Sequence, residues 1–234
     1  LYSSMIRAID TSDHCALTII RLYHIRLATP HPVVSRKHMY TEINQCRSCG
    51  SPELLDAFSL GELALTSRYP VSREEYTPTG PLSLIVCSLC KLVQLRHDFD
   101  LGQLYGNDYG YRSGLNESMC AHLAEIVEHV TARTQLVAGD TVLDIGSNDA
   151  TLLKCYQNAG LNRWGMDPSA DQFRAFYPDD IAALPSLFDA DEFLDAAGDR
   201  AKIITSIAMF YDLPDPNRFV SGVARSLRMD GIWL

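Results

Sequence analysis

The stretch Thr141-Val-Leu-Asp-Ile-Gly-Ser-Asn-Asp-Ala150 decides how the second half of this chain is expected to fold. It begins as a short apolar strand that contains one acid, Asp144, and it reaches a turn at Gly146. The polar residues after the turn lead into an apolar pattern over residues 152–156, which predicts a helix that ends at Gly160. A strand, a glycine turn and a helix in this order indicate an α/β domain.

The alternation of helices and strands continues on both sides of this stretch. An amphipathic helix is expected from Ser113, because apolar residues recur at helical spacing between Met119 and Val130. Further strands are expected at 163–166, 181–184, 202–207 and from Gly231, with a helix from Pro216 to Leu227 before the last of them. Such alternation predicts a parallel sheet.

Two acids follow neighbouring strands and suggest a nucleoside site. Asp144-x-Gly146 ends one strand and Asp167 ends the next, and a parallel sheet binds its ligands at that edge. The dinucleotide fingerprint is incomplete, since Asn148 and Thr151 stand where its second and third glycines would be. A turn rich in Asp and Asn instead favours a cofactor with a cationic end, such as S-adenosylmethionine. The alternative is that Asp144 and Asp149 only cap the next helix.

Four of the seven cysteines form two Cys-x-x-Cys pairs, Cys46-Arg-Ser-Cys49 and Cys87-Ser-Leu-Cys90. Four thiolates close the tetrahedral sphere of a structural zinc ion, which leaves no position for substrate. Four unrelated thiols or a redox pair are the alternatives. Cys120 and Cys155 are interpreted as small buried apolar residues. The odd number of cysteines favours a reducing compartment, so a cytoplasmic location is expected.

The composition of the chain further limits the classes of function that are expected. The chain has 234 residues, 47% of them hydrophobic, and a net charge of −9. It has no apolar run long enough to span a membrane, and its acidity disfavours a nucleic-acid partner. Residues 1–38 carry a net charge of +3, so residues 39–234 carry −12. We interpret residues 1–38 as an extension of uncertain origin. We expect a zinc-binding domain at 39–106 and a cofactor domain at 107–234, and the sequence does not indicate an oligomeric state.

The stretch 142–149 resembles the first cofactor motif of class I S-adenosylmethionine-dependent methyltransferases. Together with the cysteine module, it is similar to the zinc-containing sugar C-methyltransferases, which act on nucleotide-linked keto-deoxysugars. The stretches 60–65, 109–114, 208–216 and 230–233 fit that family in the same order, so that the resemblance covers Met39 to Leu234. It implies a Rossmann-like sheet of seven strands in the order 3-2-1-4-5-7-6, here without its final strands, preceded by a small zinc domain.

The resemblance also implies roles for individual residues. The zinc ligands would be Cys46, Cys49, Cys87 and Cys90. The methionine and ribose side of the cofactor would meet Asp144, Gly146, Ser147, Asn148 and Asp149, and the ribose would be held by Asp167 with Pro168 shaping the turn. The adenine would lie near Leu187 and Phe188, the methyl-donor end near Met209 and Phe210, and the sugar near Tyr111 and Ser113. These last six residues are also compatible with a place in the core or on the surface.

Two departures from the family pattern argue against methyltransferase activity of this chain alone. Ala150 replaces a glycine, and its methyl group is expected to crowd the cofactor. The family's Glu-His-Leu-x-Tyr-Tyr segment, which contains the base, would lie beyond Leu234. The sequence therefore predicts an inactive fragment of low solubility, with the fifth strand as an exposed edge. His97, His122 and His129, in a loop or on the amphipathic helix, are interpreted as structural.

Other functions remain open from the sequence. One is a class I methyltransferase for another small molecule, a nucleobase or a protein, although residues 208–212 lack the motif typical of base methylation. Another is a non-catalytic, zinc-dependent binding module on a degenerate methyltransferase fold. A nicotinamide-dependent oxidoreductase is disfavoured by the missing glycines.

Overall fold

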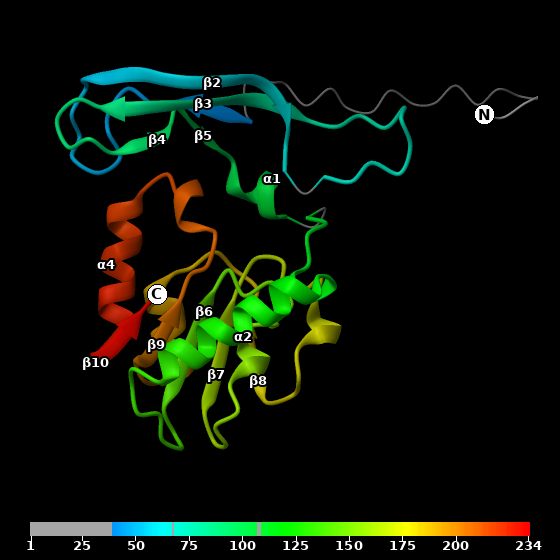
Figure 1. Ribbon diagram of the computed structural model, residues 1–234, viewed down its shortest axis with the longest axis vertical. Coiled ribbons are helices and arrows are strands. Elements are labelled where there is room, and N and C mark those ends of the chain that lie inside the picture. Colours follow the sequence, from blue (N-terminus) through cyan, green and yellow to red (C-terminus); the bar gives the residue numbers. More distant parts are fainter. Residues whose placement is uncertain (1–38, 67, 107–108) are drawn as a thin grey trace, which may run out of the picture. The chain divides into compact units, whose positions relative to one another are not determined.

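The computed structural model describes residues 39–66, 68–106 and 109–234 (Figure 1). All of them belong to one unit, Ser35–Leu234. The interpretation of residues 1–38 lies outside the described residues. Among the helices described, none is long and apolar enough to cross a membrane.

The first part of the described chain consists of two small antiparallel sheets. Strands β2 (Leu54–Ala64), β3 (Thr79–Cys87) and β4 (Val93–Leu95) form one of them, and β1 (Tyr40–Glu42) pairs with β5 (His97–Phe99) in the other. Strands β3 and β4 thus lie on either side of the second cysteine pair. The structure also places His97 in a strand and not in a loop. The short helix α1 (Leu101–Tyr105) follows β5, and its Leu104 packs with Met39 and Leu65 in a small core.

The second part contains a five-stranded parallel sheet in the order β10-β9-β6-β7-β8. The strands are β6 (Thr141–Ile145), β7 (Asn162–Met166), β8 (Ile181–Leu184), β9 (Ala201–Thr205) and β10 (Leu227–Trp233). Counted along the chain, their order across the sheet is 3-2-1-4-5, as the resemblance implied for the first five strands. Every residue of β6 and β9 is buried, because both strands are central and both faces of the sheet are covered.

Helices cover the two faces of this sheet. Helix α2 (Glu117–Thr131) packs its Leu123 and Val127 against β6, β8 and β9 in one core. Helices α3 (Ala190–Ala197) and α4 (Pro216–Ser226) close the other face, where Phe193 and Val223 belong to a second core (Figure 1). The result is a three-layer α/β/α domain whose strands all end at the same edge.

Two sequence-based expectations for this domain were wrong, and one helix was not foreseen. Instead of the helix to Gly160, the chain forms only a 3-10 turn, Leu153–Cys155, since Asn148 and Ala150 have left-handed φ angles of 50° and 60° that interrupt a helical path. The last strand begins at Leu227 and contains an irregularity before Ile232, so Leu227 does not extend the helix from Pro216. Helix α3 was not foreseen, because its apolar pattern spans only eight residues.

Candidate functional site

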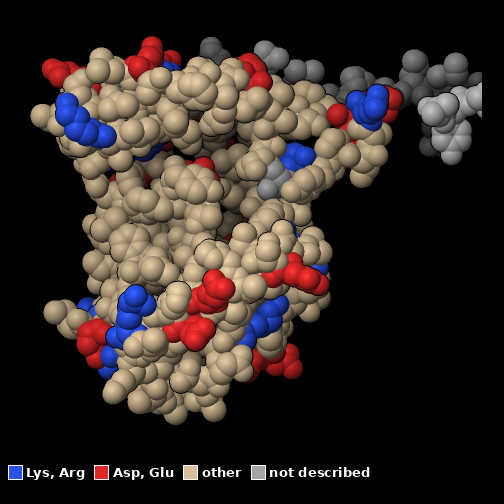
Figure 2. Space-filling model, in the orientation of Figure 1, with Lys and Arg blue, Asp and Glu red and all other residues tan. Residues whose placement is uncertain are grey.

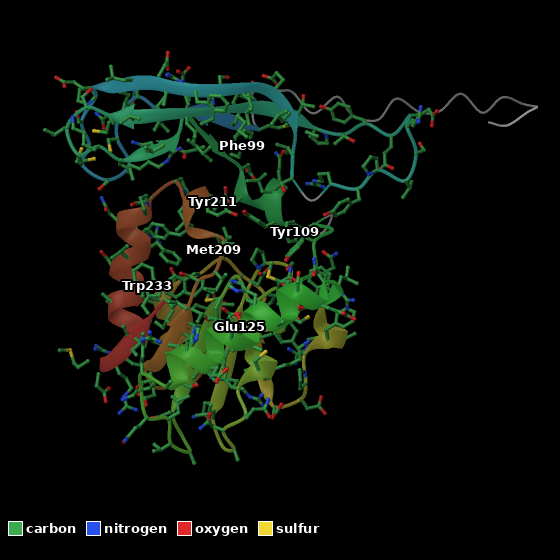
Figure 3. All side chains as sticks on the ribbon, in the orientation of Figure 1. Phe99, Tyr109, Glu125, Met209, Tyr211 and Trp233 are labelled. Atoms are coloured by element: carbon green, nitrogen blue, oxygen red, sulfur yellow. The ribbon has the colours of Figure 1, made fainter. Side chains whose placement is uncertain are left out.

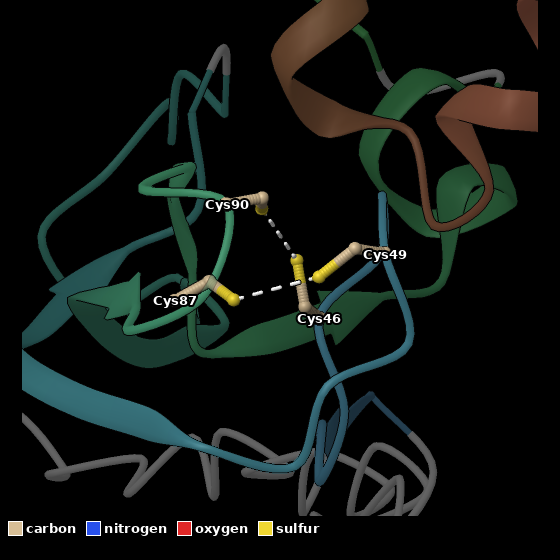
Figure 4. A group of neighbouring side chains, drawn as sticks. All are labelled: Cys46, Cys49, Cys87 and Cys90. Atoms are coloured by element: carbon tan, nitrogen blue, oxygen red, sulfur yellow. Dashed lines mark hydrogen bonds between the residues drawn. The ribbon is translucent and has the colours of Figure 1, made fainter.

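The four paired cysteines converge on one point (Figure 4). The Sγ atoms of Cys46 and Cys90 lie 3.6 Å apart, as do those of Cys49 and Cys87, and all four lie within 4.8 Å of one another. A tetrahedral zinc ion with Zn–S bonds of about 2.3 Å needs S–S separations of about 3.8 Å. The donor set and its spacing therefore fit zinc.

Two equivalent turns bring these cysteines together. The backbone N–H of Gly50 donates to the carbonyl of Cys46 (2.9 Å), and that of Lys91 donates to the carbonyl of Cys87 (3.0 Å). Gly50 and Lys91 have φ angles of 73° and 66°, so each turn closes through a left-handed residue directly after its second cysteine. Glycine adopts this conformation freely, whereas lysine does so at a cost in backbone energy.

Hydrogen bonds around the cluster favour thiolates at two of its cysteines. Burial raises the pKa of Cys46, but N–H donors from Cys49, Gln94 and Ser48 outweigh it and bring the pKa to about 6. The N–H of Cys90 likewise lowers the pKa of Cys87. Gln94 Nε2 lies 3.3 Å from Cys46 Sγ, and the N–H of Arg47 fixes the other end of the Gln94 amide at 3.0 Å. Such outer contacts orient the ligands of a metal site.

A second site lies over the ends of β6, β7, β8 and β9, where a cavity of about 280 Å³ opens. Its wall contains Asp144, Gly146, Ser147, Asn148, Asp167, Pro168, Leu187, Phe188, Met209, Tyr111 and Ser113. Asp149 and Phe210 are not part of that wall, because Asp149 is buried behind the turn and Phe210 packs against Phe219 and Trp233. In Figure 3, Met209 lies above β6 and Tyr109 lies below α1.

Asp167 is fixed as an acceptor at the end of β7. Its Oδ1 accepts from the N–H (2.7 Å) and the hydroxyl (2.6 Å) of Ser169, and its Oδ2 accepts from the N–H of Asn148 (2.9 Å). The side chain thus has one orientation, and Oδ2 keeps acceptor capacity toward the cavity. This geometry suits a pair of ribose hydroxyls.

Asp144 is a buried acid at the floor of the same cavity, with 4% of its surface exposed. Burial raises its pKa to about 7, although the hydroxyl of Thr205 donates to its Oδ1 (2.6 Å) and lowers the pKa, and the nearby charge of Asp167 raises it again. A ligand cation close to Asp144 would compensate this buried charge. The floor of the cavity therefore fits a positively charged group.

Asn148 and Asp149 hold the segment 111–114 against the turn. Asn148 accepts from the N–H of Ser113 (2.9 Å) and donates to the carbonyl of Tyr111 (3.1 Å). Asp149, which is 1% exposed, accepts from the N–H of Gly114 (3.1 Å). Asp149 also accepts from the N–H (3.3 Å) and the hydroxyl of Thr151, so its side chain caps the turn as well as holding the segment 111–114.

Glycine and alanine around the turn have different roles. Gly146 has a φ of 78°, and a Cβ there would lie 3.4 Å from Met209 Cγ, so glycine keeps this part of the cavity open. Ala150 is fully buried in the core on the α2 side of the sheet and is not a wall residue. The expectation that its methyl group crowds the cofactor is therefore not supported; its cost is the left-handed backbone.

Several wall residues were not predicted as site residues, among them His122, which the sequence analysis interpreted as structural. Tyr105 and Tyr109 belong to the segment from α1 onward, His122 lies on α2, and Asp212 ends the 3-10 turn Phe210–Asp212. The hydroxyl of Tyr105 donates to Asp212 Oδ2 across 107 positions of sequence. No local motif announces such a pair. On the face shown in Figure 2, acidic and basic side chains are interspersed over and around α2.

Comparisons with known proteins agree with this geometry. Residues 46–105 match the family described as "Putative zinc binding domain", and residues 111–234 match the family described as "Methyltransferase domain". C-methyltransferase NovU of Streptomyces niveus is 27% identical over 195 residues, which cover 82% of this chain. The match covers 46% of that relative, so this chain spans about half of its length.

Solved structures give shorter matches. A "Complex between the Haloferax volcanii Trm112 methyltransferase activator and the putative methyltransferase" is 26% identical, with a TM-score of 0.40 over 51% of this chain and 54% of the other. The plantazolicin methyltransferase BpumL in complex with a desmethylPZN analogue and SAH is 14% identical, with a TM-score of 0.37 over 46% of this chain and 42% of the other.

The parallel strand order, the glycine turn after β6 and the acid after β7 define a class I methyltransferase fold, preceded by a four-cysteine cluster with the geometry of a zinc site. Because the family match covers more than half of the chain, this chain belongs to the methyltransferase-domain family.

Proposed function

We propose that this chain is the cofactor-binding and zinc-binding part of an S-adenosylmethionine-dependent C-methyltransferase that acts on a nucleotide-linked keto-deoxysugar. The observation that carries the proposal is the cavity that joins Asp144 and Asp167 beneath the segment 111–114. The likeness to C-methyltransferase NovU and the residue pattern of the sugar C-methyltransferase family support the reaction type and the substrate class.

The proposed cofactor lies over the ends of β6, β7 and β8. Asp167 accepts the ribose hydroxyls, Leu187 and Phe188 flank the adenine, and the floor around Asp144 and Gly146 receives the charged methionine end. S-adenosylmethionine, when bound, supplies a methyl group on a positively charged sulfur. The protein's part is to orient that end beside Met209 and to exclude water from it. Tyr111 and Ser113 face the sugar in this arrangement.

The zinc ion is proposed to be structural. All four protein ligands are cysteines, so that no coordination position remains for a substrate. Thiolate ligands persist in a reducing compartment, which supports a cytoplasmic location. We also propose the domain boundary between residues 106 and 107, after α1.

Calorimetric titration of the zinc-loaded protein with S-adenosylhomocysteine tests the cofactor assignment. We expect Asp167→Ala to lose at least about 2 kcal/mol of binding free energy, because hydrogen bonds to a charged group contribute about 1.5–3 kcal/mol each. Asp179→Ala, a substitution of an exposed acid outside the cavity, is the matched control. Equal affinities for both variants, or no binding by folded wild-type protein, would contradict the proposal.

A further inference from the structure

One side of the cavity is not used by the proposed cofactor. Of the described residues in the cavity wall, three are carboxylates, and two of them, Asp144 and Asp167, belong to the proposed cofactor site. The third, Asp212, follows β9 on the same turn as Met209, whereas Asp167 follows β7. Because β6 lies between β9 and β7 in the sheet, Asp212 is on the opposite side of the Gly146 turn from Asp167. This is the side on which a methyl acceptor would meet the cofactor.

The carboxylate of Asp212 is half-buried and is held through one of its two oxygens. The hydroxyl of Tyr105 donates to Asp212 Oδ2. Oδ1 accepts a hydrogen bond from none of the residues that the structure describes, although each carboxylate oxygen has two lone pairs. Tyr105 therefore restricts the orientation of the carboxylate, and Oδ1 keeps its acceptor capacity for a ligand in the cavity that Asp212 lines.

The other groups on this side of the cavity suit the ring of a sugar. The rings of Tyr105, Tyr109 and Tyr111 follow one another edge-on along the wall, with centroids 5.2 and 6.3 Å apart. Ile207 and Leu213 add aliphatic surface. Apolar and aromatic walls can pack against the C–H groups of a sugar ring, while a few polar groups fix its orientation through the hydroxyls.

We propose that Asp212 is a specificity residue that accepts a hydrogen bond from a hydroxyl of the acceptor sugar, and that Tyr105 positions it. This inference rests on the proposed function, since it assumes that the methyl acceptor is a sugar beside the cofactor. It gives Asp212 no part in proton transfer. The methyl acceptor is then a keto-deoxysugar that keeps a free hydroxyl near the methylated carbon.

The hydrogen bond gives selectivity because an analogue without the hydroxyl leaves Oδ1 unpaired. Burial raises the pKa of Asp212 and outweighs the hydrogen bond from Tyr105, which lowers it, so this carboxylate is poorly solvated. A sugar without the hydroxyl would still displace water from Oδ1 and would give no hydrogen bond in return. Sites built to bind a substrate hydroxyl reject the analogue that lacks it for this reason.

Calorimetry with matched sugar nucleotides tests this selectivity. The zinc-loaded chain, saturated with S-adenosylhomocysteine, would be titrated with thymidine diphosphate-linked 4-keto-6-deoxyglucose and with its analogues that lack the hydroxyl at carbon 2 or at carbon 3. We expect one analogue to bind wild type about tenfold to a hundredfold more weakly than the parent sugar nucleotide. Asp212→Ala should bind both ligands equally, because the acceptor is gone. The control Asp195→Ala removes an exposed acid on α3 and should keep the wild-type ratio.

Tyr105→Phe tests the positioning role through the same ratio of affinities. Without the hydroxyl of Tyr105, the carboxylate of Asp212 can rotate away from the ligand. The ratio between parent and analogue should then fall below that of wild type and stay above that of Asp212→Ala. A purely structural role for Tyr105 would weaken the binding of both ligands alike and leave the ratio unchanged.

The outcomes separate this inference from the proposed function. If S-adenosylhomocysteine does not bind to folded wild-type protein, the proposed function fails. If it binds, three results would each overturn the inference: wild type does not bind the parent sugar nucleotide, neither analogue differs from the parent, or the difference persists in Asp212→Ala. Asp212→Asn keeps the size of the side chain and replaces Asp212→Ala if that variant does not fold; its neutral amide should give a smaller ratio than wild type.

Discussion

Asp144 is expected to destabilise the protein in neutral and alkaline solution, and its replacement by asparagine should therefore stabilise it. The carboxyl is 4% exposed, and burial raises its pKa from 3.8 to about 7. Between these two values the folded state holds a proton that the unfolded state has released. Unfolding free energy must then fall as the pH rises through this window, and it levels off above the folded pKa.

The size of the effect follows from the same two pKa values. Between about pH 5 and about pH 8, stability falls only up to the folded pKa, which is a span of about two pH units. Each unit corresponds to about 1.36 kcal/mol, so the unfolding free energy should fall by about 3 kcal/mol. Asp144→Asn keeps an oxygen that accepts from Thr205 and removes the titration. Its advantage over wild type should grow by about 3 kcal/mol over this pH range.

Urea unfolding of both proteins at several pH values, at fixed zinc concentration, measures this difference directly. Asp195→Asn on α3 serves as a control, since its exposed carboxyl should give a curve parallel to that of wild type. Parallel curves for wild type and Asp144→Asn would refute the reasoning. The same substitution should weaken binding of S-adenosylhomocysteine, because a buried negative charge that is costly alone becomes favourable beside a ligand cation.

Three other substitutions or treatments have defined outcomes. Gly165→Ala would place a Cβ 2.6 Å from Ser147 Oγ, so we expect a loss of about 1–3 kcal/mol by urea unfolding and weaker binding of S-adenosylhomocysteine by calorimetry. Lys91→Gly relieves a left-handed φ of 66° and should stabilise the zinc-loaded protein by about 1 kcal/mol, whereas Lys91→Ala should not. Chelation of the metal should abolish the protection of β3 amides against hydrogen exchange while β6 stays protected, and added zinc should restore it.

Features set by local chemistry could be predicted from the sequence. The strand 141–145 is apolar and bounded by turn residues, and the paired cysteines share one spacing, so the strand and the cysteine cluster could both be predicted. The order of the five strands followed from the family resemblance rather than from periodicity. The missing helix after Gly146 shows the limit of periodicity, because the left-handed residues Asn148 and Ala150 precede an apolar pattern that indicated a helix.

Features set by distant contacts could not be predicted. Asn148 lines the cavity as expected, but the sequence did not indicate that Asn148 and Asp149 also bind the backbone of residues 111–114. The contact between Tyr105 and Asp212 has no sequence signature, because it forms only where α1 and the turn after β9 meet. A motif indicates which residue types are present, but the contacts of these residues depend on partners that lie far away in the sequence.

The zinc cluster and the cavity are connected through the chain that joins them. Strand β5, which pairs with β1, leads directly into α1, and α1 ends at Tyr105, so the small sheets determine where this tyrosine meets Asp212. At a second point the Nδ2 of Asn217 on α4 donates to the carbonyl of Ser48, between the first two zinc ligands, at 2.8 Å. A zinc ion bound by the four cysteines would thus act on the cavity by fixing one of its walls. Loss of zinc should therefore impair the Tyr105–Asp212 side of the site more than the Asp167 side, which is built entirely from the parallel sheet and its turns.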